Sequence, residues 1–379
     1  MTGRMDTQPP PGTRVVVLSA SVGGGHDGAA DELARRLRAA GLTAERYDYL
    51  DLLPTAVRRL LREGYRRQLD VAPATFEWIF DTLHRHRLLA NVSASGAALA
   101  GPAMLRVIGN DCALVVSTYP AASHTLGWLR RTGRLSTPAV TYLTDLSAHR
   151  LWVAGGIDIH FALHEITAGQ AEASGAAGVR VVAPAVAPGF RPDPDPVARA
   201  AARQRFGLPA TGRLALLATG SWGTGEVEQS AADVIGTGLA TPVVACGRND
   251  SLRERLVRGG LGIALGWVED MPALLRACDV VVQNAGGLSS LEALASGLPV
   301  ITHRPVPGHG LTNAAALDAA GLAVWVRRPE LLAPVLDDVL DGPVGRAQDA
   351  AARRLFAAPE PAAELARLAG RGRSSLMPA

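Results

Sequence analysis

Lysine is absent from the 379-residue sequence, so all 38 positively charged side chains are arginines. A nucleotide-triphosphatase loop needs a lysine on the phosphates, and a Schiff-base or pyridoxal phosphate enzyme needs a lysine amine. Both classes of enzyme are therefore excluded. A GC-rich genome explains the arginine bias more simply than selection for phosphate binding does.

Cysteine, net charge and long apolar runs are also scarce. Cys112, Cys246 and Cys278 lack the spacing of a zinc site or a disulfide framework, which predicts reduced thiols. The net charge of +3 is too small to indicate nucleic acid as a partner. No apolar run is long enough to span a membrane, and residues 1–13 lack the apolar core of a signal peptide. We therefore expect a cytoplasmic protein that contacts membranes only peripherally, at the inner face of the plasma membrane.

The composition fits two α/β domains, because 48% of the residues are apolar and the chain is long enough for two cores. Strand-like runs alternate with helical patterns, which predicts parallel sheets with crossover helices. The strand-like runs lie at 15–18, 114–117, 140–143, 159–163 and 179–182 and, in a second series, at 214–218, 243–246, 262–265, 280–283, 300–302 and 323–326.

A proline-rich segment, 183–196, separates the two series and resists helix formation. We predict two Rossmann-like domains at 14–187 and 188–360 with a cleft between them. A disordered tail is expected at 1–13, and a C-terminal helix or tail at 361–379 is expected to pack back on the first domain.

The most informative segment follows the first strand-like run, where Ser21-Val22-Gly23-Gly24-Gly25-His26 precedes a helix expected over 29–39. Glycines between a strand and a helix let the backbone approach a ligand, and helix N–H groups favour an anion. An imidazole can in addition take up a proton near neutral pH. The histidine thus suggests more than a phosphate-binding loop.

Three glycine-containing segments follow strand-like runs of the second domain. Gly220-Ser221-Trp222-Gly223-Thr224-Gly225 could bind a diphosphate through its N–H groups and hydroxyls. Gly247-Arg248-Asn249 supplies a cation for phosphate or for a helix salt bridge. Gly286-Gly287-Leu288-Ser289 opens a helix with Glu292, whose carboxylate could accept both ribose hydroxyls or form a capping box with Ser289.

Other segments are less specific. Pro307-Gly308-His309-Gly310 could close over a ligand with Asn313 as its anchor, or could simply be a turn. Asp145 and His149 end a strand-like run of the first domain, where they are either site residues or turn formers.

The segment 57–69 has apolar residues at helical spacing opposite an arginine-rich face. This pattern is typical of a helix that lies on an anionic membrane, and a solvated surface helix is the alternative.

Together these segments resemble a family of glycosyltransferases that contains monogalactosyldiacylglycerol synthases and bacterial diacylglycerol glucosyltransferases (glycosyltransferase family 28-like). The enzyme that adds N-acetylglucosamine to lipid I is a more distant relative. The residues that carry the resemblance are Val22 to His26, Val116 to Pro120, Thr144-Asp145 with His149 and Trp152, Cys246 to Asn249, Gly286 to Glu292, Pro307-Gly308 and Asn313.

The resemblance implies the GT-B fold, with a UDP-sugar held mainly by the second domain and a lipid or lipid-like acceptor by the first. It implies that the backbone around Trp267-Val268 faces the base, that Ser289 lies near the phosphates and that Glu292 holds the ribose. Donor-side residues also include Gly220 to Gly223, Arg248, Gly286 to Leu288, His309 and Asn313. The acceptor side includes Gly24, Gly25, Tyr119, Asp145, His149 and Trp152.

The implied reaction inverts the sugar's configuration. His26 removes the proton of the acceptor hydroxyl, which attacks the anomeric carbon opposite the leaving diphosphate. Helix N-termini and Arg248 would stabilise the growing charge, so we expect no metal and no cofactor. A DxD-like acidic pair, Asp193 and Asp195, lies in the proline-rich connector and not at a strand end.

Two departures from the family leave the sugar open. Asn284 stands where relatives often carry a basic residue, and His309-Gly310 stands where they have Gln-Glu or Gln-Gln. Alternatives are transfer to a soluble secondary metabolite and a non-catalytic protein that binds sugar nucleotides. A sugar-nucleotide epimerase of the same fold ranks last.

Overall fold

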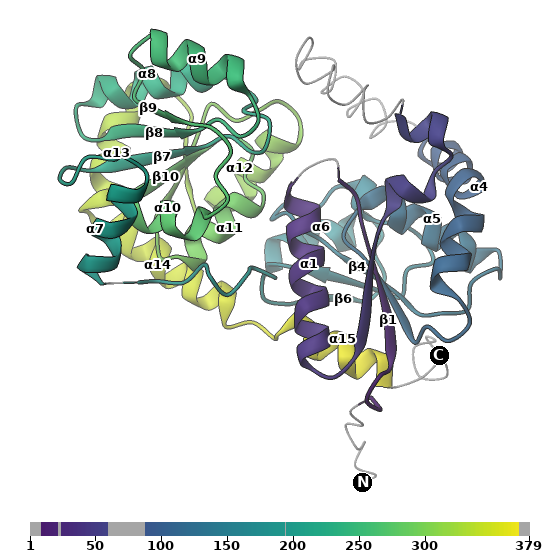
Figure 1. Ribbon diagram of the computed structural model, residues 1–379. Helices are drawn as coiled ribbons and strands as arrows, with labels where there is room; N and C mark the ends of the chain where they lie inside the picture. Colours follow the sequence, from purple (N-terminus) through teal and green to yellow (C-terminus); the bar gives the residue numbers. More distant parts are fainter. Residues whose placement is uncertain (1–8, 22–23, 60–87, 194, 371–379) are drawn as a thin grey trace. The chain divides into compact units, whose positions relative to one another are not determined.

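The computed structural model describes residues 9–21, 24–59, 88–193 and 195–370 (Figure 1). These residues form two compact units. The second unit runs from Val186 to Phe356, and the first is built from the described residues before and after it. Residues 60–69 of the predicted interfacial helix and residues 1–8 of the predicted tail lie outside the described ranges.

The first unit is built on a parallel six-stranded sheet in the order β2-β1-β3-β4-β5-β6. Its strands are β1 (Arg14–Ser19), β2 (Thr43–Asp48), β3 (Leu114–Ser117), β4 (Ala139–Tyr142), β5 (Ile159–Ala162) and β6 (Val179–Val181). Strand β2 was not predicted, because its sequence, TAERYD, is mostly polar and its side chains are only half-buried at the sheet edge.

The helices of the first unit cover both faces of its sheet (Figure 1). They are α1 (Gly24–Ala39), α4 (Leu88–Ile108), α5 (Pro120–Arg131), α6 (Glu165–Ala173) and α15 (Pro361–Gly370), with short 3-10 helices η1 (Tyr49–Leu52) and η2 (Arg150–Trp152). The C-terminal helix α15 packs beside α1, and Arg36 of α1 forms an ion pair with Glu360 at 3.1 Å.

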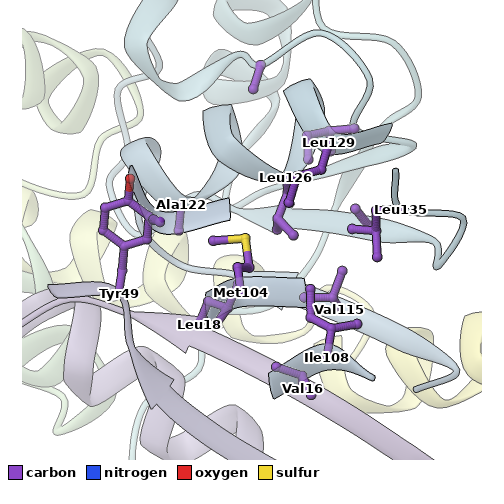
Figure 2. Packing of buried hydrophobic residues seen from close by; sticks show 14 of the residues in the cluster. Val16, Leu18, Tyr49, Met104, Ile108, Val115, Ala122, Leu126, Leu129 and Leu135 are labelled. Atoms are coloured by element: carbon purple, nitrogen blue, oxygen red, sulfur yellow. The ribbon is translucent and has the colours of Figure 1, made fainter. Parts of the chain in front are cut away.

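The core of the first unit holds β1 and β3, the two strands at whose ends the predicted His26 and Tyr119 segments begin. Val16 and Leu18 of β1 and Val115 of β3 pack against Met104 of α4 and Leu126 of α5 (Figure 2). Val15, Val17 and Ser19 of β1 are buried as well, as expected for a parallel sheet covered on both faces. This packing sets where the chain leaves β1 and β3.

The second unit is built on another parallel six-stranded sheet, in the order β12-β11-β10-β7-β8-β9. Its strands are β7 (Leu214–Ala218), β8 (Thr241–Ala245), β9 (Ile263–Leu265), β10 (Val280–Gln283), β11 (Val300–His303) and β12 (Val324–Val326). The predicted alternation of parallel strands and helices is confirmed in both units.

Helices flank this sheet as well (Figure 1). They are α7 (Pro196–Arg205), α8 (Val227–Thr237), α9 (Asp250–Arg258), α10 (Met271–Ala277), α11 (Leu288–Ala295), α12 (His309–Ala319), α13 (Leu332–Leu340) and α14 (Pro343–Phe356), with the 3-10 helix η3 (Pro329–Leu331). None of the helices that the structure describes is both long enough and apolar enough to span a bilayer.

Each sheet has one point where the strand order reverses: between β1 and β3 in the first unit, and between β7 and β10 in the second. Loops that leave neighbouring strands at such a point diverge to opposite faces, which opens a crevice where α/β proteins bind ligands. These two points are therefore where site residues are expected.

Candidate functional site

His26 lies in the first turn of α1, next to the switch point of the first sheet. The prediction that the helix begins near residue 29 was wrong, because α1 begins at Gly24 despite the low helix propensity of its three glycines, at 24, 25 and 28. The Nδ1 atom of His26 lies 2.8 Å from the carbonyl oxygen of Thr118, directly after β3. A carbonyl only accepts, so in the neutral imidazole Nδ1 carries the proton and Nε2 carries the lone pair.

Aromatic side chains surround this imidazole. The Tyr119 ring meets it edge-on at 5.3 Å between centroids, and the Trp152 ring lies 5.7 Å away. The hydroxyl of Thr144 is 3.3 Å from Nδ1. Tyr119 and Trp152, both predicted on the acceptor side, are thus brought together around the predicted base by loops after β3 and β4.

The remaining acceptor-side residues occupy two segments. Gly24 and Gly25 form the start of α1 before His26. Asp145 lies half-buried in the loop after β4, and His149 is the N-cap residue of η2, which carries Trp152. Gly24 and Gly25 thus follow β1 at the switch point, whereas Asp145 and His149 follow β4, the strand beyond β3.

An ionic tether holds the first turn of α1 to the sheet. Asp27, the neighbour of His26, accepts a hydrogen bond from the hydroxyl of Ser19 at 2.8 Å and pairs with the guanidinium of Arg46. Arg46 also donates to the Ser19 hydroxyl at 2.9 Å. The residues of this tether were missed in the sequence, because Arg46 belongs to the unpredicted edge strand β2.

In the second unit, the loops after β7 and β8 interlock. The backbone N–H of Arg248 donates to the carbonyl of Ser221 at 2.9 Å, and the Asn249 side chain donates to that of Trp222 at 3.1 Å. Gly247 has φ +61°, and a Cβ there would lie 2.4 Å from the Ser221 oxygen. These contacts hold Gly220 to Gly223 in the shape of a tight turn directly after β7.

The side chain of Arg248 stacks on an exposed tryptophan. Its guanidinium carbon lies 4.2 Å from the centroid of the Trp267 ring, and Trp267 is 52% exposed. Trp267 and Val268 follow β9, one strand further from the switch point. A flat cation on a flat aromatic surface provides a stacking face at this edge of the sheet.

The loop after β10 is fixed by buried amides. Gly286 has φ +78°, and a Cβ there would press on Asn313 and Leu317 of α12 at 3.1 Å. The fully buried Asn313 donates to the carbonyl of Ala285 at 3.3 Å. Asn284 donates to the carbonyl of Thr224 at 2.7 Å, which joins this loop to the loop after β7 across the switch point.

Glu292 lies on α11 and is not part of a helix cap. Gly287 is the N-cap residue, so Leu288 and Ser289 are the first two helical residues and Glu292 lies two residues too late for a capping box. The capping alternative is therefore wrong. Desolvation by burial raises the pKa of Glu292 from 4.5 to about 8. Such a perturbed carboxyl beside a glycine loop is typical of a binding site.

His309 is the first residue of α12, where it follows Gly308 at φ +75°. The N-termini of α11 and α12 both follow strands on the β10 side of the switch point, so the positive ends of the two helix dipoles favour an anion at this end of the sheet.

The acidic pair of the connector has structural partners. Asp193 pairs with Arg276 of α10 at 2.8 Å, and Asp195 accepts from the N–H of Val197 as the N-cap of α7. Among the residues that the structure describes, no group of three or more histidine, cysteine, aspartate or glutamate side chains is arranged to hold a metal ion.

Comparison with known proteins gives one family match in each of the two units. Residues 26–183 match the monogalactosyldiacylglycerol (MGDG) synthase family, and residues 262–354 match the glycosyl transferases of group 1. The first match covers most of the first sheet and includes His26, Thr118, Tyr119 and Trp152. The second covers Trp267 and the helices α11 and α12.

Two curated relatives are processive diacylglycerol beta-glucosyltransferases. The protein from Bacillus subtilis (strain 168) is 27% identical over 225 residues, which are 57% of this chain and 58% of the relative. The protein from Bacillus cereus (strain G9842) is 22% identical over 367 residues, 93% of this chain and 92% of the relative. The chain thus spans just over half the length of the first relative and most of the second.

The solved structures support the fold. The UGT71G1 protein of Medicago truncatula, complexed with UDP-glucose, superposes with a TM-score of 0.56 at 14% identity over 91% of this chain and 93% of that protein. Two parallel six-stranded sheets of this kind define the GT-B architecture predicted from the sequence. The chain therefore has the GT-B fold, its two units each match a glycosyltransferase family, and it is similar to the MGDG synthases and diacylglycerol glucosyltransferases.

Proposed function

We propose that the protein is an inverting glycosyltransferase that moves a sugar from a UDP-sugar to a hydroxyl group of a lipid or lipid-like acceptor, without a metal ion, at the inner face of the membrane. The observation that carries the proposal is the 2.8 Å contact between Nδ1 of His26 and the Thr118 carbonyl. It leaves the lone pair on Nε2, the atom that a general base needs.

The proposed reaction is a single displacement. Nε2 of His26 takes the proton of the acceptor hydroxyl as its oxygen bonds to the anomeric carbon. The bond from that carbon to the diphosphate oxygen breaks at the same time, so UDP leaves from the opposite face. The N–H groups at the start of α11, the turn at Gly220 to Gly223 and Arg248 would stabilise the negative charge on UDP.

The donor is assigned to the second unit on the strength of its loops. They present backbone N–H groups, the stacking face of Trp267 and the Glu292 carboxyl at the ends of neighbouring strands. A nucleoside diphosphate has a base, a ribose and an anion that match these three features. The relative complexed with UDP-glucose has the same fold, which supports a uridine nucleotide as the donor.

The acceptor is assigned to the first unit. The half-buried Tyr119 supplies aromatic surface beside His26, while the buried Trp152 packs behind the imidazole, and both curated relatives carry diacylglycerol in their names. The departures at Asn284 and His309 remain the reason to test several sugars, because these side chains lie on the loops proposed for the donor.

The decisive experiment measures turnover of UDP-glucose, UDP-galactose and UDP-N-acetylglucosamine with diacylglycerol in vesicles. His26→Ala should lower kcat by at least about a hundredfold, because proton transfer contributes that much. The matched control is His164→Asn, which replaces another imidazole of the first unit but keeps an N-cap acceptor for α6. Unchanged turnover in His26→Ala would refute the assignment of the base.

Two further measurements test the details of the proposal. The anomeric configuration of the product, read by NMR coupling constants, should be opposite to that of the donor. Replacing Arg58, Arg59, Arg62, Arg66 and Arg67 together should abolish binding to anionic vesicles. Intact turnover of the same variant with a soluble acceptor would favour a secondary metabolite over a lipid.

A further inference from the structure

Arg304, directly after β11, has a strained backbone. Among the residues that the structure describes, it is the one non-glycine with a positive φ, 47°. This conformation costs an L-residue about 1–2 kcal/mol, and the following Pro305 disfavours the helical ψ range for it as well. Such strain persists where surrounding contacts hold it, and it concentrates at functional sites.

The side chain of Arg304 is held by two carboxylates of α8. Its Nε donates to Asp233 at 2.7 Å, and its Nη1 pairs with Glu226, the N-cap residue of α8. The buried His303 donates from Nε2 to the same oxygen of Asp233 at 2.7 Å. Burial alone would raise the pKa of Asp233, but the hydrogen bonds from Arg304 and His303 outweigh it and hold the pKa below its ordinary value.

The turn at Arg304 directs the chain across the ends of β10 and β7. The N–H of Val306 donates to the carbonyl of Asn284 at 2.7 Å. One methyl of Val306 lies 3.1 Å from where a Cβ on Gly225 would be, and the other lies 2.6 Å from where a Cβ on Gly310 would be. Val306 therefore packs closely against the β7–α8 loop, the β10–α11 loop and the start of α12.

These contacts link two loops that the proposed function assigns to the donor. Glu226 directly follows the glycine loop 219–225, and residues 305–308 lead directly to His309. The ion pair with Glu226 therefore joins the entry of α8 to the loop that leads into α12, and the ion pair with Asp233 anchors this loop to the middle of α8. Since the side chain of Glu226 is 60% exposed and that of Asp233 is 23% exposed, the ion pair with Asp233 should contribute most of the stabilisation.

We propose that Arg304 is a positioning residue that locks the 305–309 loop against the glycine loop 219–225 and so shapes the surface that binds a nucleoside diphosphate sugar. The inference rests on the proposed function. Arg304 itself need not touch the donor. Its strained backbone sets the direction of the loop, and its two ion pairs keep the loop there.

The test uses Arg304→Gly, because glycine accepts a positive φ without strain and removes the side chain that forms both ion pairs. The matched control is Arg255→Gln. Arg255 of α9 also donates to a carboxylate in the first turn of α8, Glu228 at 2.9 Å, but it is not attached to the 305–309 loop. Arg304→Lys keeps a positive charge without the forked geometry and serves if the glycine variant does not fold.

Two readouts on the full-length protein separate the parts of the proposal. Calorimetric titration with UDP and with the preferred UDP-sugar should show about tenfold weaker binding in Arg304→Gly and no change in Arg255→Gln. Hydrogen exchange should show faster exchange at Val306 in Arg304→Gly alone. The unfolding temperature should change little, because lost ion pairs and relieved strain oppose each other.

Equal binding of the donor by Arg304→Gly and the wild type would overturn the inference, as would equal weakening in Arg255→Gln. Failure of the wild type to bind any UDP-sugar would instead overturn the proposed donor, and the exchange rate at Val306 would then decide whether Arg304 holds the loop. Faster exchange at Val306 together with weaker donor binding supports the whole proposal.

Discussion

The imidazole of His26 is oriented by the main-chain carbonyl of Thr118, 2.8 Å from Nδ1. A carbonyl is present whatever the side chain at that position, so β3 and the turn after it determine the tautomer. The hydroxyl of Thr118 donates in return to the carbonyl of His26 at 3.0 Å. The two residues, 92 positions apart, hold each other at the switch point of the first sheet.

The tether at Asp27 should matter for the rate of the reaction. Asp27→Ala removes the contacts with Ser19 and Arg46 that fix the first turn of α1, so His26 should lose its alignment. We expect kcat to fall about tenfold, with an unchanged KM for the donor. Steady-state kinetics over a range of UDP-sugar concentrations measures both.

The control for this prediction is Asp31→Ala. Asp31 lies one turn further along α1 and pairs with the same guanidinium at 3.3 Å, but its side chain is 63% exposed. An equal loss of kcat in both variants would mean that the charge of Arg46, and not the position of His26, is responsible.

Gly247 should be irreplaceable for steric reasons. In Gly247→Ala the new methyl would meet the carbonyl oxygen of Ser221 at 2.4 Å, so the turn at Gly220 to Gly223 must move. Gly260→Ala is the matched control, because Gly260 has φ +62° and nothing within 4 Å of its Cβ position. Both should lose about 1 kcal/mol of unfolding free energy to backbone strain.

The difference between the two glycine variants isolates the contact with Ser221. Gly247→Ala should lose at least about 2 kcal/mol more in urea unfolding, and its melting temperature should not rise with UDP. If it is stabilised by UDP like the control, the turn after β7 does not bind the diphosphate.

Glu292 should make stability fall as the pH rises. Its folded-state pKa of about 8 lies above the ordinary value of 4.5, so between these values the folded state keeps a proton that the unfolded chain has lost. The free energy of unfolding should therefore decrease from about pH 5 to pH 8, by roughly 2–4 kcal/mol from this group.

The variant Glu292→Gln isolates this effect, since glutamine does not titrate. It should be about as stable as the wild type at pH 5 and more stable at pH 8, as measured by urea unfolding at both values. If glutamine also abolishes the stabilisation by UDP, the same carboxyl binds the ribose. A pH-independent difference between the two proteins would contradict the raised pKa.

Activity should survive a chelator. EDTA at about 5 mM is in large excess over trace metal. We expect turnover in its presence to equal turnover without it. Asp193→Asn should also remain active, because this carboxylate is engaged with Arg276. Loss of activity that Mg²⁺ or Mn²⁺ restores would show that a cation, and not helix N-termini with Arg248, balances the charge of the leaving diphosphate.

Much of the fold could be predicted from local patterns. Buried strands such as Val280–Gln283 carry continuous apolar runs, here Val280 to Val282, and are followed by glycine or a turn, so both sheets were recognisable. Edge strand β2 was not, because a half-exposed strand with Glu45 and Arg46 has no apolar pattern. The start of α1 was placed too late, because glycines at 24 and 25 have low helix propensity, and contacts of His26 and Asp27 with the sheet override it.

The amino-acid sequence by itself determined the chemistry that is available: no lysine, a histidine after a glycine run, and glycine-opened helices after parallel strands. Only the tertiary structure decided the partners of those groups, because they lie far apart in the chain. Thr118 orients His26 over 92 positions, and Asp233 holds Arg304 over 71. Strand order brings such residues together, and strand order is set by the packing of whole sheets and helices, which no local pattern contains.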